Sequence, residues 1–393
     1  MTRILQLAAV PLLALAASAS ADTRRADDTR PCVKVTLPVI INATTSTFDI
    51  PRVDNTIDAV DFAWEIDHRG SRAPPQRITG QKVIDDEFFI DAKLCIPKDG
   101  AKRDILQIAT HGFGFDSRYW DSQIDPEKYS YVDAALKKGY SILTYDRLGT
   151  GHSDRPDAYD VVQIPTEIEV LSEIATLARD GLGEDMGDAK AALDIPTFDK
   201  IVLVGHSLGS SVTLGVLEKY PDLADGAVST GLFPSDIFTA AGQRSFGLEY
   251  AAENDPEEFK NCGSGYMVPG IRAAIQQLFF KKGHFDKKML EYAESIKQTG
   301  TVGEFLTLTA PFGVPAPEYK GPLLFALGEL DFAVCMGNCT GAYDLDGLKK
   351  DVYPNAKDLR AHVQPGSGHA LTMHDDAQGH FKAIFDYLDE FEL

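Results

Sequence analysis

The chain has 393 residues, of which 44% are hydrophobic, and a formal net charge of −21 at pH 7. This length is sufficient for one large catalytic domain with an inserted segment, or for two domains. Because so acidic a chain repels phosphates, its composition argues against a nucleic-acid partner and says little about a neutral substrate.

The N-terminus has the pattern of a secretory signal peptide. Arg3 precedes a mainly apolar run over residues 4–17, and the small residues Ala19, Ser20 and Ala21 follow as a cleavage site. The run is too short to span a bilayer comfortably, and no later segment has the length of a transmembrane helix. We therefore expect residues 1–21 to be removed and the mature protein to be secreted, without a stable membrane anchor.

The cysteines and two sequons fit an exported glycoprotein. Five cysteines follow the leader: Cys32, Cys95, Cys262, Cys335 and Cys339. Exported proteins keep most cysteines paired, but an odd number leaves at least one free or paired outside the chain. Cys335 can join Cys339, or one of the two can reach Cys262, so the connectivity stays open. Sequons stand at Asn42 and Asn338, and the cysteine spacing indicates no zinc site.

Residues 22–100 precede the part of the chain in which strands and helices alternate. Residues 22–57 are polar apart from the apolar stretch 33–41, and we expect them to form an arm over the main domain. Residues 60–66 and 83–95 are rich in Val, Ile and Phe, which predicts strands at an antiparallel edge of a sheet.

Strands and helices then alternate from residue 101 to residue 232. The predicted strands are residues 105–110, 141–145, 200–204 and 226–230. The predicted helices are residues 129–138, 165–181 and 211–220. This alternation predicts an α/β fold, in which helices cover both faces of a mostly parallel sheet.

The alternation stops after residue 232. Residues 233–317 show no strand pattern, and two stretches within them, 271–280 and 285–296, have helical character. Strands resume over residues 322–327 and 359–364, before a C-terminal helix over residues 377–391. We interpret residues 233–317 as a helical lid inserted after the sixth strand, between core segments 101–232 and 318–393.

The strongest chemical signal is Gly205-His-Ser-Leu-Gly209, which follows the buried strand Ile201–Val204 and precedes a helix that begins with small residues. A serine at the tip of a tight strand-to-helix turn needs flanking glycines for space, and its hydroxyl then projects freely. The helix N-terminus also favours developing negative charge. The pattern predicts Ser207 as a nucleophile.

A serine hydroxyl needs a base to remove its proton. His369, in Gly366-Ser-Gly-His369, follows the last predicted strand and is the favoured base, with His374 and His380 as alternatives.

The base in turn needs an acid that orients its ring. Asp331, in Gly328-Glu-Leu-Asp331, fits the order of serine, acid and histidine along the chain. Glu329 and Asp236 are the alternatives.

An oxyanion intermediate needs two preorganised donors. One is expected from the backbone N–H of Leu208, directly after the nucleophile. The other is expected from the N–H of Phe113, in the glycine-containing loop His111-Gly-Phe-Gly114. We expect His111 itself to be structural.

From about Arg103 to the C-terminus the chain resembles the α/β-hydrolase superfamily. His111-Gly112 looks like its oxyanion motif, Tyr145-Asp-Arg-Leu-Gly-Thr-Gly-His-Ser153 like its D-x-x-G-x-G-x-S loop, and Gly205–Gly209 like its nucleophile elbow. The resemblance places Asp331 and His369 where the family has its acid and base. Residues 22–100 are outside the common core and are similar to the N-terminal extensions of secreted fungal members.

Together these features predict a secreted serine hydrolase that cleaves an ester or lactone of a neutral or apolar small molecule, without cofactor or metal. A serine at the elbow argues against epoxide-hydrolase and dehalogenase chemistry, which use a carboxylate there. Amide or peptide cleavage, carbon–carbon hydrolysis and acyl transfer use the same residues and stay open. A catalytically silent binding protein on the same scaffold is the alternative from another class. The sequence leaves the oligomeric state open.

Aromatic residues gather in the predicted lid, where they either line an apolar pocket or form the lid's own core. They are Phe233, Phe238, Phe246, Phe279, Phe280 and Phe312.

Overall fold

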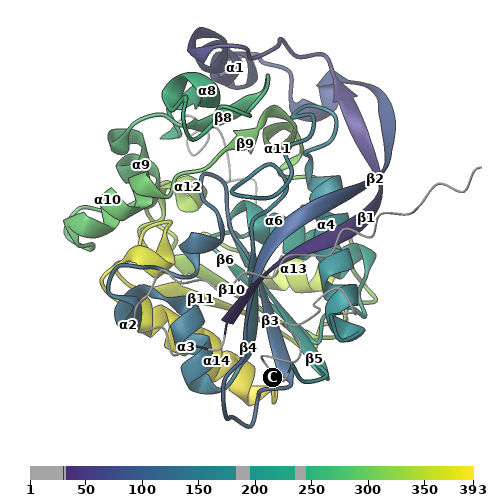
Figure 1. The fold of residues 1–393 in the computed structure, drawn as a ribbon, viewed down its shortest axis with the longest axis vertical. Coiled ribbons are helices and arrows are strands. Elements are labelled where there is room, and N and C mark those ends of the chain that lie inside the picture. The colour runs from purple at the N-terminus through teal and green to yellow at the C-terminus, as the bar shows by residue number, and fades with distance from the viewer. Residues whose placement is uncertain (1–29, 31, 183–194, 235–244) are drawn as a thin grey trace, which may run out of the picture.

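The computed structural model describes residues 30, 32–182, 195–234 and 245–393. Its centre is an eight-stranded sheet with the order β1-β2-β4-β3-β5-β6-β10-β11 (Figure 1). The strands are β1 (Cys32–Phe48), β2 (Ile78–Cys95), β3 (Ile105–Thr110), β4 (Ser141–Tyr145), β5 (Lys200–His206), β6 (Gly226–Thr230), β10 (Pro322–Gly328) and β11 (Asp358–Gln364). From β4 to β11 all neighbours are parallel, whereas β1 and β2 run antiparallel to theirs. The predicted α/β fold with a mostly parallel sheet is confirmed.

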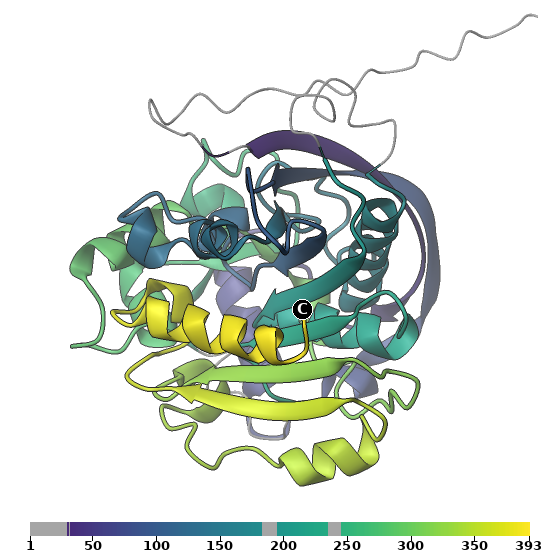
Figure 2. The ribbon, with the colours of Figure 1, turned by 90° about the horizontal axis from the view of Figure 1, so that it is seen from below.

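Helices cover both faces of this sheet. Helices α3 and α14 lie on one face, and α4 and α6 lie on the other (Figure 2). The helices of the core are α2 (Pro126–Tyr129), α3 (Tyr131–Lys138), α4 (Ile164–Arg179), α6 (Leu208–Lys219), α12 (Phe332–Cys335), α13 (Leu345–Asp351) and α14 (Ala377–Glu390). The 3₁₀ turns are η1 (Pro74–Arg77), η2 (Ser117–Tyr119) and η4 (Leu371–Met373). The strands β3, β5, β6 and β10 are fully or almost fully buried, as expected for a sheet covered on both sides.

The first strand corrects the prediction of an N-terminal arm. Residues 33–41 lie in β1, a long strand that pairs with β2 from Cys32 opposite Cys95 to Phe48 opposite Ile78. Its buried side chains alternate with more exposed ones, which is the two-residue period of a strand with one face against the core. β1 is therefore an edge strand of the main sheet.

Residues 60–66, which we predicted as a strand, form part of helix α1 (Thr56–Asp67). The side chain of Asn55 caps this helix, and Ala59 and Phe62 form its buried side. Their spacing of three residues fits a helix and not a strand. The strand prediction relied on composition alone and is wrong.

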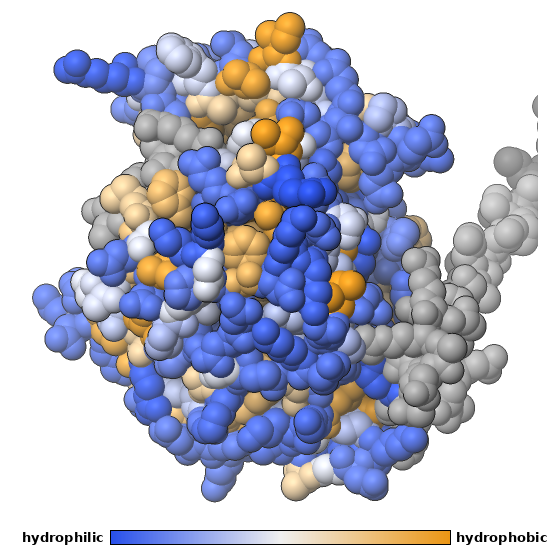
Figure 3. Space-filling view, turned by 90° about the vertical axis from the view of Figure 1, so that its left-hand side faces the viewer, coloured by the Kyte–Doolittle hydropathy of each residue, from blue (hydrophilic) through white to orange (hydrophobic). Residues whose placement is uncertain are grey.

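The opposite side of α1 exposes an apolar stripe. Ile57, Val60 and Trp64, spaced by three and four residues, are 81%, 59% and 70% exposed. Figure 3 shows apolar atoms gathered at the upper end of the molecule, where Figure 1 places α1. The helix contacts strand β7, so this apolar surface lies beside the segment inserted into the core.

The segment between β6 and β10 contains helices and also a small sheet. Its helices are α8 (Ala251–Asn254), α9 (Arg272–Phe279), α10 (Lys287–Ser295) and α11 (Val302–Thr307). Its strands, β7 (Leu248–Tyr250), β8 (Tyr266–Pro269) and β9 (Gly300–Thr301), form an antiparallel sheet in that order. The expectation of a segment without strands is wrong, because strands of two to four residues leave no periodic pattern. We call residues 245–317 the insertion.

The structure joins Cys32 to Cys95 and Cys335 to Cys339, and leaves Cys262 buried with a free thiol. The first bond ties the start of β1 to the end of β2, and the second closes a short loop after β10. Among the described residues, no helix combines the length and apolar character needed to cross a bilayer. The predicted signal peptide lies outside the described residues.

Candidate active site

Ser207 occupies the sharp turn between β5 and α6. Its backbone has φ 53° and ψ −117°, a conformation that L-residues rarely adopt. A Cβ on Gly205 would lie 2.5 Å from the Cα of Ser210, and one on Gly209 would lie 2.3 Å from the carbonyl oxygen of Thr110. Only glycine fits at either position, which explains the spacing of the motif.

Three side chains from separate loops form one chain of hydrogen bonds. The Nε2 of His369 lies 2.9 Å from the Oγ of Ser207. The Nδ1 of the same histidine lies 2.7 Å from a carboxylate oxygen of Asp331. All three residues are buried, with Ser207 the most exposed at 8%. A carboxylate only accepts hydrogen bonds, so Nδ1 carries the proton and Nε2 is free to accept the serine proton.

The loop after β10 holds Asp331 through both carboxylate oxygens. One oxygen meets His369, and the other accepts the N–H of Val334 at 2.9 Å as the cap of helix α12. The disulfide between Cys335 and Cys339 follows at once, and Cys339 donates its N–H to the carbonyl of Glu329. The disulfide therefore closes residues 335–339, and the hydrogen bond from Cys339 to Glu329 closes the longer loop that contains Asp331.

The alternative bases occupy other positions. His374 accepts the N–H of Gly368 and donates to the carbonyl of Ala370, so both of its ring nitrogens support the loop that carries His369. Burial lowers the pKa of His374 to about 4, which keeps this support neutral. His380 is buried within α14, and burial lowers its pKa to about 3.

The alternative acid Glu329 does not join this chain of hydrogen bonds. Glu329 accepts a hydrogen bond from the backbone N–H of Gly366 and so helps to hold the loop that carries His369. Asp236 lies outside the described residues.

The loop after β3 passes directly over the serine. A Cβ on Gly112 would lie 2.9 Å from the Cβ of Ser207, so the backbone there approaches as closely as glycine permits. Among the described residues, neither the N–H of Phe113 nor that of Leu208 donates a hydrogen bond. The two predicted oxyanion donors therefore have no hydrogen-bond acceptor within the described part of the chain.

His206, inside the elbow motif, packs below His369. Its ring stacks on Tyr119 with centroids 4.3 Å apart and lies 5.0 Å from the ring of His369. Burial, with the neighbouring histidines, lowers the pKa of His206 far below its usual range. The neutral imidazole of His206 therefore packs against His369, the predicted base.

A narrow pocket opens onto Ser207 and is mainly apolar. Its described lining residues are Phe113, Ser207, Leu208, Phe246, Glu304, Phe305, Leu308, Ala333 and His369. The oxygens of Glu304 already meet the guanidinium of Arg147 and the N–H of Thr301. The one carboxylate among these lining residues is therefore internally satisfied.

Of the insertion side chains that line the pocket, the sequence predicts only Phe246; it does not predict Glu304, Phe305 and Leu308. A signal for the local structure was present, because Thr301-Val-Gly-Glu304 is a capping box and the structure shows both of its hydrogen bonds. That signal identifies the start of helix α11 but not the pocket that the helix faces. Phe238 lies outside the described residues.

The other predicted lid aromatics pack elsewhere. Phe233 contacts Phe325 of β10, and Phe280 stacks on His374. Phe279 packs near His369, with ring centroids 5.6 Å apart, but is not among the lining residues. Within the described residues, no three His, Cys, Asp or Glu side chains are grouped so as to hold a metal ion.

Residues 108–379 match the model of the alpha/beta hydrolase family, and the chain belongs to this family. Three curated proteins also match, each 28% identical over 130 residues; they are uncharacterized proteins of Mycobacterium tuberculosis (two strains) and Mycobacterium bovis. The match covers 32% of this chain and 29% of each relative.

Several solved structures are similar at low identity. An esterase from Thermogutta terrifontis is 15% identical with a TM-score of 0.46, and 86% of this chain and 98% of that chain are covered. A monoacylglycerol lipase from Paleococcus ferrophilus is 16% identical with a TM-score of 0.48, at coverages of 76% and 98%. A putative aryl esterase from Burkholderia cenocepacia is 17% identical with a TM-score of 0.47, at coverages of 77% and 95%.

Proposed function

We propose that the protein is a secreted serine hydrolase that cleaves a carboxylic ester or lactone of a neutral or apolar small molecule through an acyl-enzyme. The observation that carries the proposal is the chain of hydrogen bonds from Ser207 through His369 to Asp331, at 2.9 and 2.7 Å. The proposed nucleophile and base, and the base and its proposed orienting acid, already lie within hydrogen-bonding distance.

In the proposed reaction, the Oγ of Ser207 forms a bond to the substrate carbonyl carbon while its proton moves to Nε2 of His369. Asp331 holds the ring and stabilises the imidazolium. The N–H groups of Phe113 and Leu208 stabilise the oxyanion. The alcohol leaves with the proton from His369 as the carbon–oxygen bond breaks. Water then attacks the acyl-enzyme, giving its proton to His369, and the carboxylic acid leaves as Ser207 recovers its proton.

The pocket supports a neutral or apolar substrate. Its lining side chains around the serine are mostly aromatic or aliphatic, and Glu304 is paired with Arg147. A charged acyl group would lose its hydration without gaining a partner among the described lining residues. An ester or lactone with an apolar acyl part fits this surface better.

Secretion is supported by the leader pattern and by the two disulfides, since such bonds persist in oxidising compartments. Both sequon asparagines, Asn42 and Asn338, are exposed. Recovery of the protein from the medium with Asp22 as its first residue would support this part of the proposal. Retention of residues 1–21 on an intracellular product would contradict it.

A fluorophosphonate probe tests the nucleophile. We expect the wild type and the control variant Ser172→Ala, a buried serine on α4, to be labelled. We expect Ser207→Ala to remain unlabelled. If the wild type takes no label, or Ser207→Ala labels equally, the serine-hydrolase proposal is wrong and a silent binding protein becomes the better interpretation.

Matched substrates test the bond. We expect measurable hydrolysis of p-nitrophenyl butyrate and at least about 100-fold slower cleavage of the corresponding p-nitroanilide, because an amine is a poorer leaving group than a phenolate. Faster cleavage of the anilide would replace the esterase proposal with an amidase. His369→Ala should abolish ester hydrolysis, whereas His362→Ala, on β11, should retain it.

A further inference from the structure

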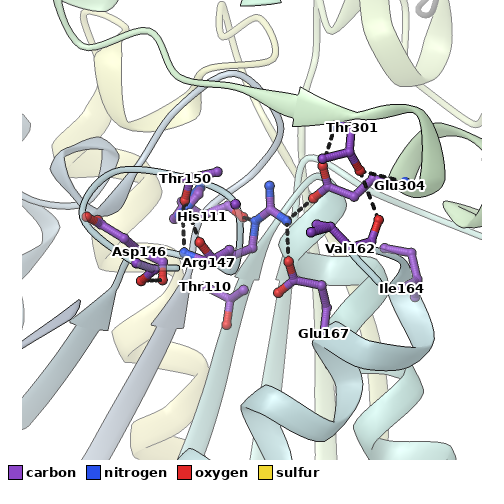
Figure 4. A network of polar contacts seen from close by, with 12 residues as sticks. Thr110, His111, Asp146, Arg147, Thr150, Val162, Ile164, Glu167, Thr301 and Glu304 are labelled. Atoms are coloured by element: carbon purple, nitrogen blue, oxygen red, sulfur yellow. Dashed lines mark hydrogen bonds and ion pairs between the residues drawn. The ribbon is translucent and has the colours of Figure 1, made fainter. Parts of the chain in front are cut away.

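Arg147, the second residue of the loop after β4, is fully buried and joins three segments of the chain (Figure 4). Its Nη1 meets Glu167 of α4 at 3.2 Å and also Glu304 of α11. Its Nε donates to the carbonyl of His111 at 3.1 Å, and its backbone N–H donates to the Nε2 of His111 at 3.0 Å. One side chain thus connects the core, the insertion and the loop beside the serine.

The two carboxyl groups that meet Arg147, those of Glu167 and Glu304, are not equivalent. Burial, and then the charge of Glu304, raise the pKa of Glu167 to about 8 despite the opposing effect of Arg147. The raised pKa favours the protonated form of Glu167, so Glu304 is the main counter-ion of Arg147. The insertion supplies the counter-ion of a guanidinium that belongs to the core.

His111 transmits the position of Arg147 to the predicted oxyanion donor. Because the N–H of Arg147 occupies Nε2, the ring proton of neutral His111 lies on Nδ1, which donates to the carbonyl of Gly112 at 2.9 Å. Burial and the charge of Arg147 lower the pKa of His111 well below its usual range, which keeps the ring neutral. In a trans peptide the N–H points away from the carbonyl, so the bond to Gly112 fixes the direction of the Phe113 N–H.

The insertion also touches this loop directly. Gln298 donates its N–H to the carbonyl of Gly114 at 2.9 Å. A Cβ on Gly300 would lie 1.7 Å from the ring of Phe113, so the ring packs against bare backbone of β9. The loop is therefore held between the core and residues 298–304.

We propose that Arg147 is a positioning residue through which the seating of Glu304 and helix α11 sets the orientation of the Phe113 peptide at the oxyanion site. This inference rests on the proposed serine-hydrolase function. It implies that the insertion contributes to the rate of the chemical step as well as to the shape of the pocket.

The test separates kcat from KM on p-nitrophenyl butyrate for Arg147→Met, Arg147→Lys, Glu304→Gln and the control Arg77→Met. Arg77 is also a buried arginine in an ion pair, with Glu65, but lies in the N-terminal region away from the serine. Loss of a well-placed oxyanion donor lowers kcat by about 100-fold, so we expect a fall of that order in Arg147→Met, with KM changed less than about 3-fold. Glu304→Gln should lower kcat by about 10-fold, Arg147→Lys should recover part of the loss, and Arg77→Met should keep the wild-type kcat.

An unchanged kcat in Arg147→Met, or a change confined to KM, would overturn the inference. So would an equal loss in Arg77→Met, because that would indicate a general effect of removing a buried arginine. If circular dichroism shows that Arg147→Met does not fold, Glu304→Gln decides, and an unchanged kcat there overturns the inference. Failure of the proposed function has a different signature, since Ser207 of the wild type would then take no fluorophosphonate label.

Discussion

The core and the insertion contribute different chemistry to the same pocket. The core supplies the serine, the histidine and the aspartate, each on a loop at the carboxyl end of a strand of the sheet. The insertion supplies Phe246, Phe305 and Leu308, which are apolar, and Glu304, whose charge is already paired. The contrast teaches that the proposed catalytic side chains all come from the core, whereas much of the pocket lining comes from the insertion, so that substitutions in the insertion can alter substrate fit while the three catalytic side chains stay in place.

The largest expected effect removes the acid of the core. Asp331→Asn should lower kcat by about 10⁴-fold for every ester, because the amide permits the wrong tautomer of His369 and does not stabilise its charged form. Steady-state rates on acetyl, butyryl and octanoyl esters would measure this loss. Glu329→Gln, two residues earlier, is the control and should lose less than about 10-fold. A loss in Asp331→Asn that depends strongly on acyl length would contradict the separation of roles.

A smaller effect is expected from the insertion. Phe246 is half-buried and packs on Phe113 with ring centroids 4.5 Å apart. Phe246→Ala enlarges the pocket, so the ratio of kcat/KM for octanoyl over acetyl esters should rise by about 10-fold. Phe285→Ala, another half-buried phenylalanine of the insertion that packs on Phe280, should leave the ratio unchanged. An unchanged ratio in Phe246→Ala would place substrate selection elsewhere.

The remaining effect concerns stability, and not catalysis, where the two regions meet. Glu167 faces Arg147, Glu304 and the buried phenol of Tyr145, and its pKa is raised from 4.5 to about 8. Between these values the folded protein binds one more proton than the unfolded chain, so the free energy of unfolding falls as pH rises, by at most about 1.4 kcal/mol per unit. The loss is complete above about pH 8.

Glutamine imitates the neutral acid and removes this dependence. Urea unfolding at pH 5.5 and pH 8.5 should show Glu167→Gln gaining stability relative to the wild type at the higher pH. The buried histidines titrate with the opposite sign at lower pH, but both proteins contain them, so they cancel in the difference. If the free energies of unfolding of the two proteins change by the same amount between the two pH values, Glu167 is ionised in the folded state.

The nucleophile loop could be predicted because its sequence and geometry are local. A buried strand, two glycines that leave no room for a Cβ, and a helix lie within about twenty residues of Ser207. The parallel sheet was predictable for the same reason, since each buried strand is a short apolar run.

Other features depend on residues that are distant along the chain. The ion pair between Arg147 and Glu304 joins residues 157 positions apart, and neither local sequence shows it. The small sheet of the insertion has strands too short to show the two-residue alternation of apolar and polar side chains. The strand β1 is different, because its alternation of apolar and polar residues is visible in the sequence, although the polar composition of residues 22–57 favours an arm.

The strand order also sets the time at which the predicted site is complete. Ser207 follows β5 in the middle of the sheet, whereas Asp331 and His369 follow β10 and β11, which lie later in the chain. Synthesis therefore reaches the proposed nucleophile before its proposed acid and base. Docking of β10 and β11 onto β6 brings the three groups together, so a reactive serine would report that this part of the sheet has assembled.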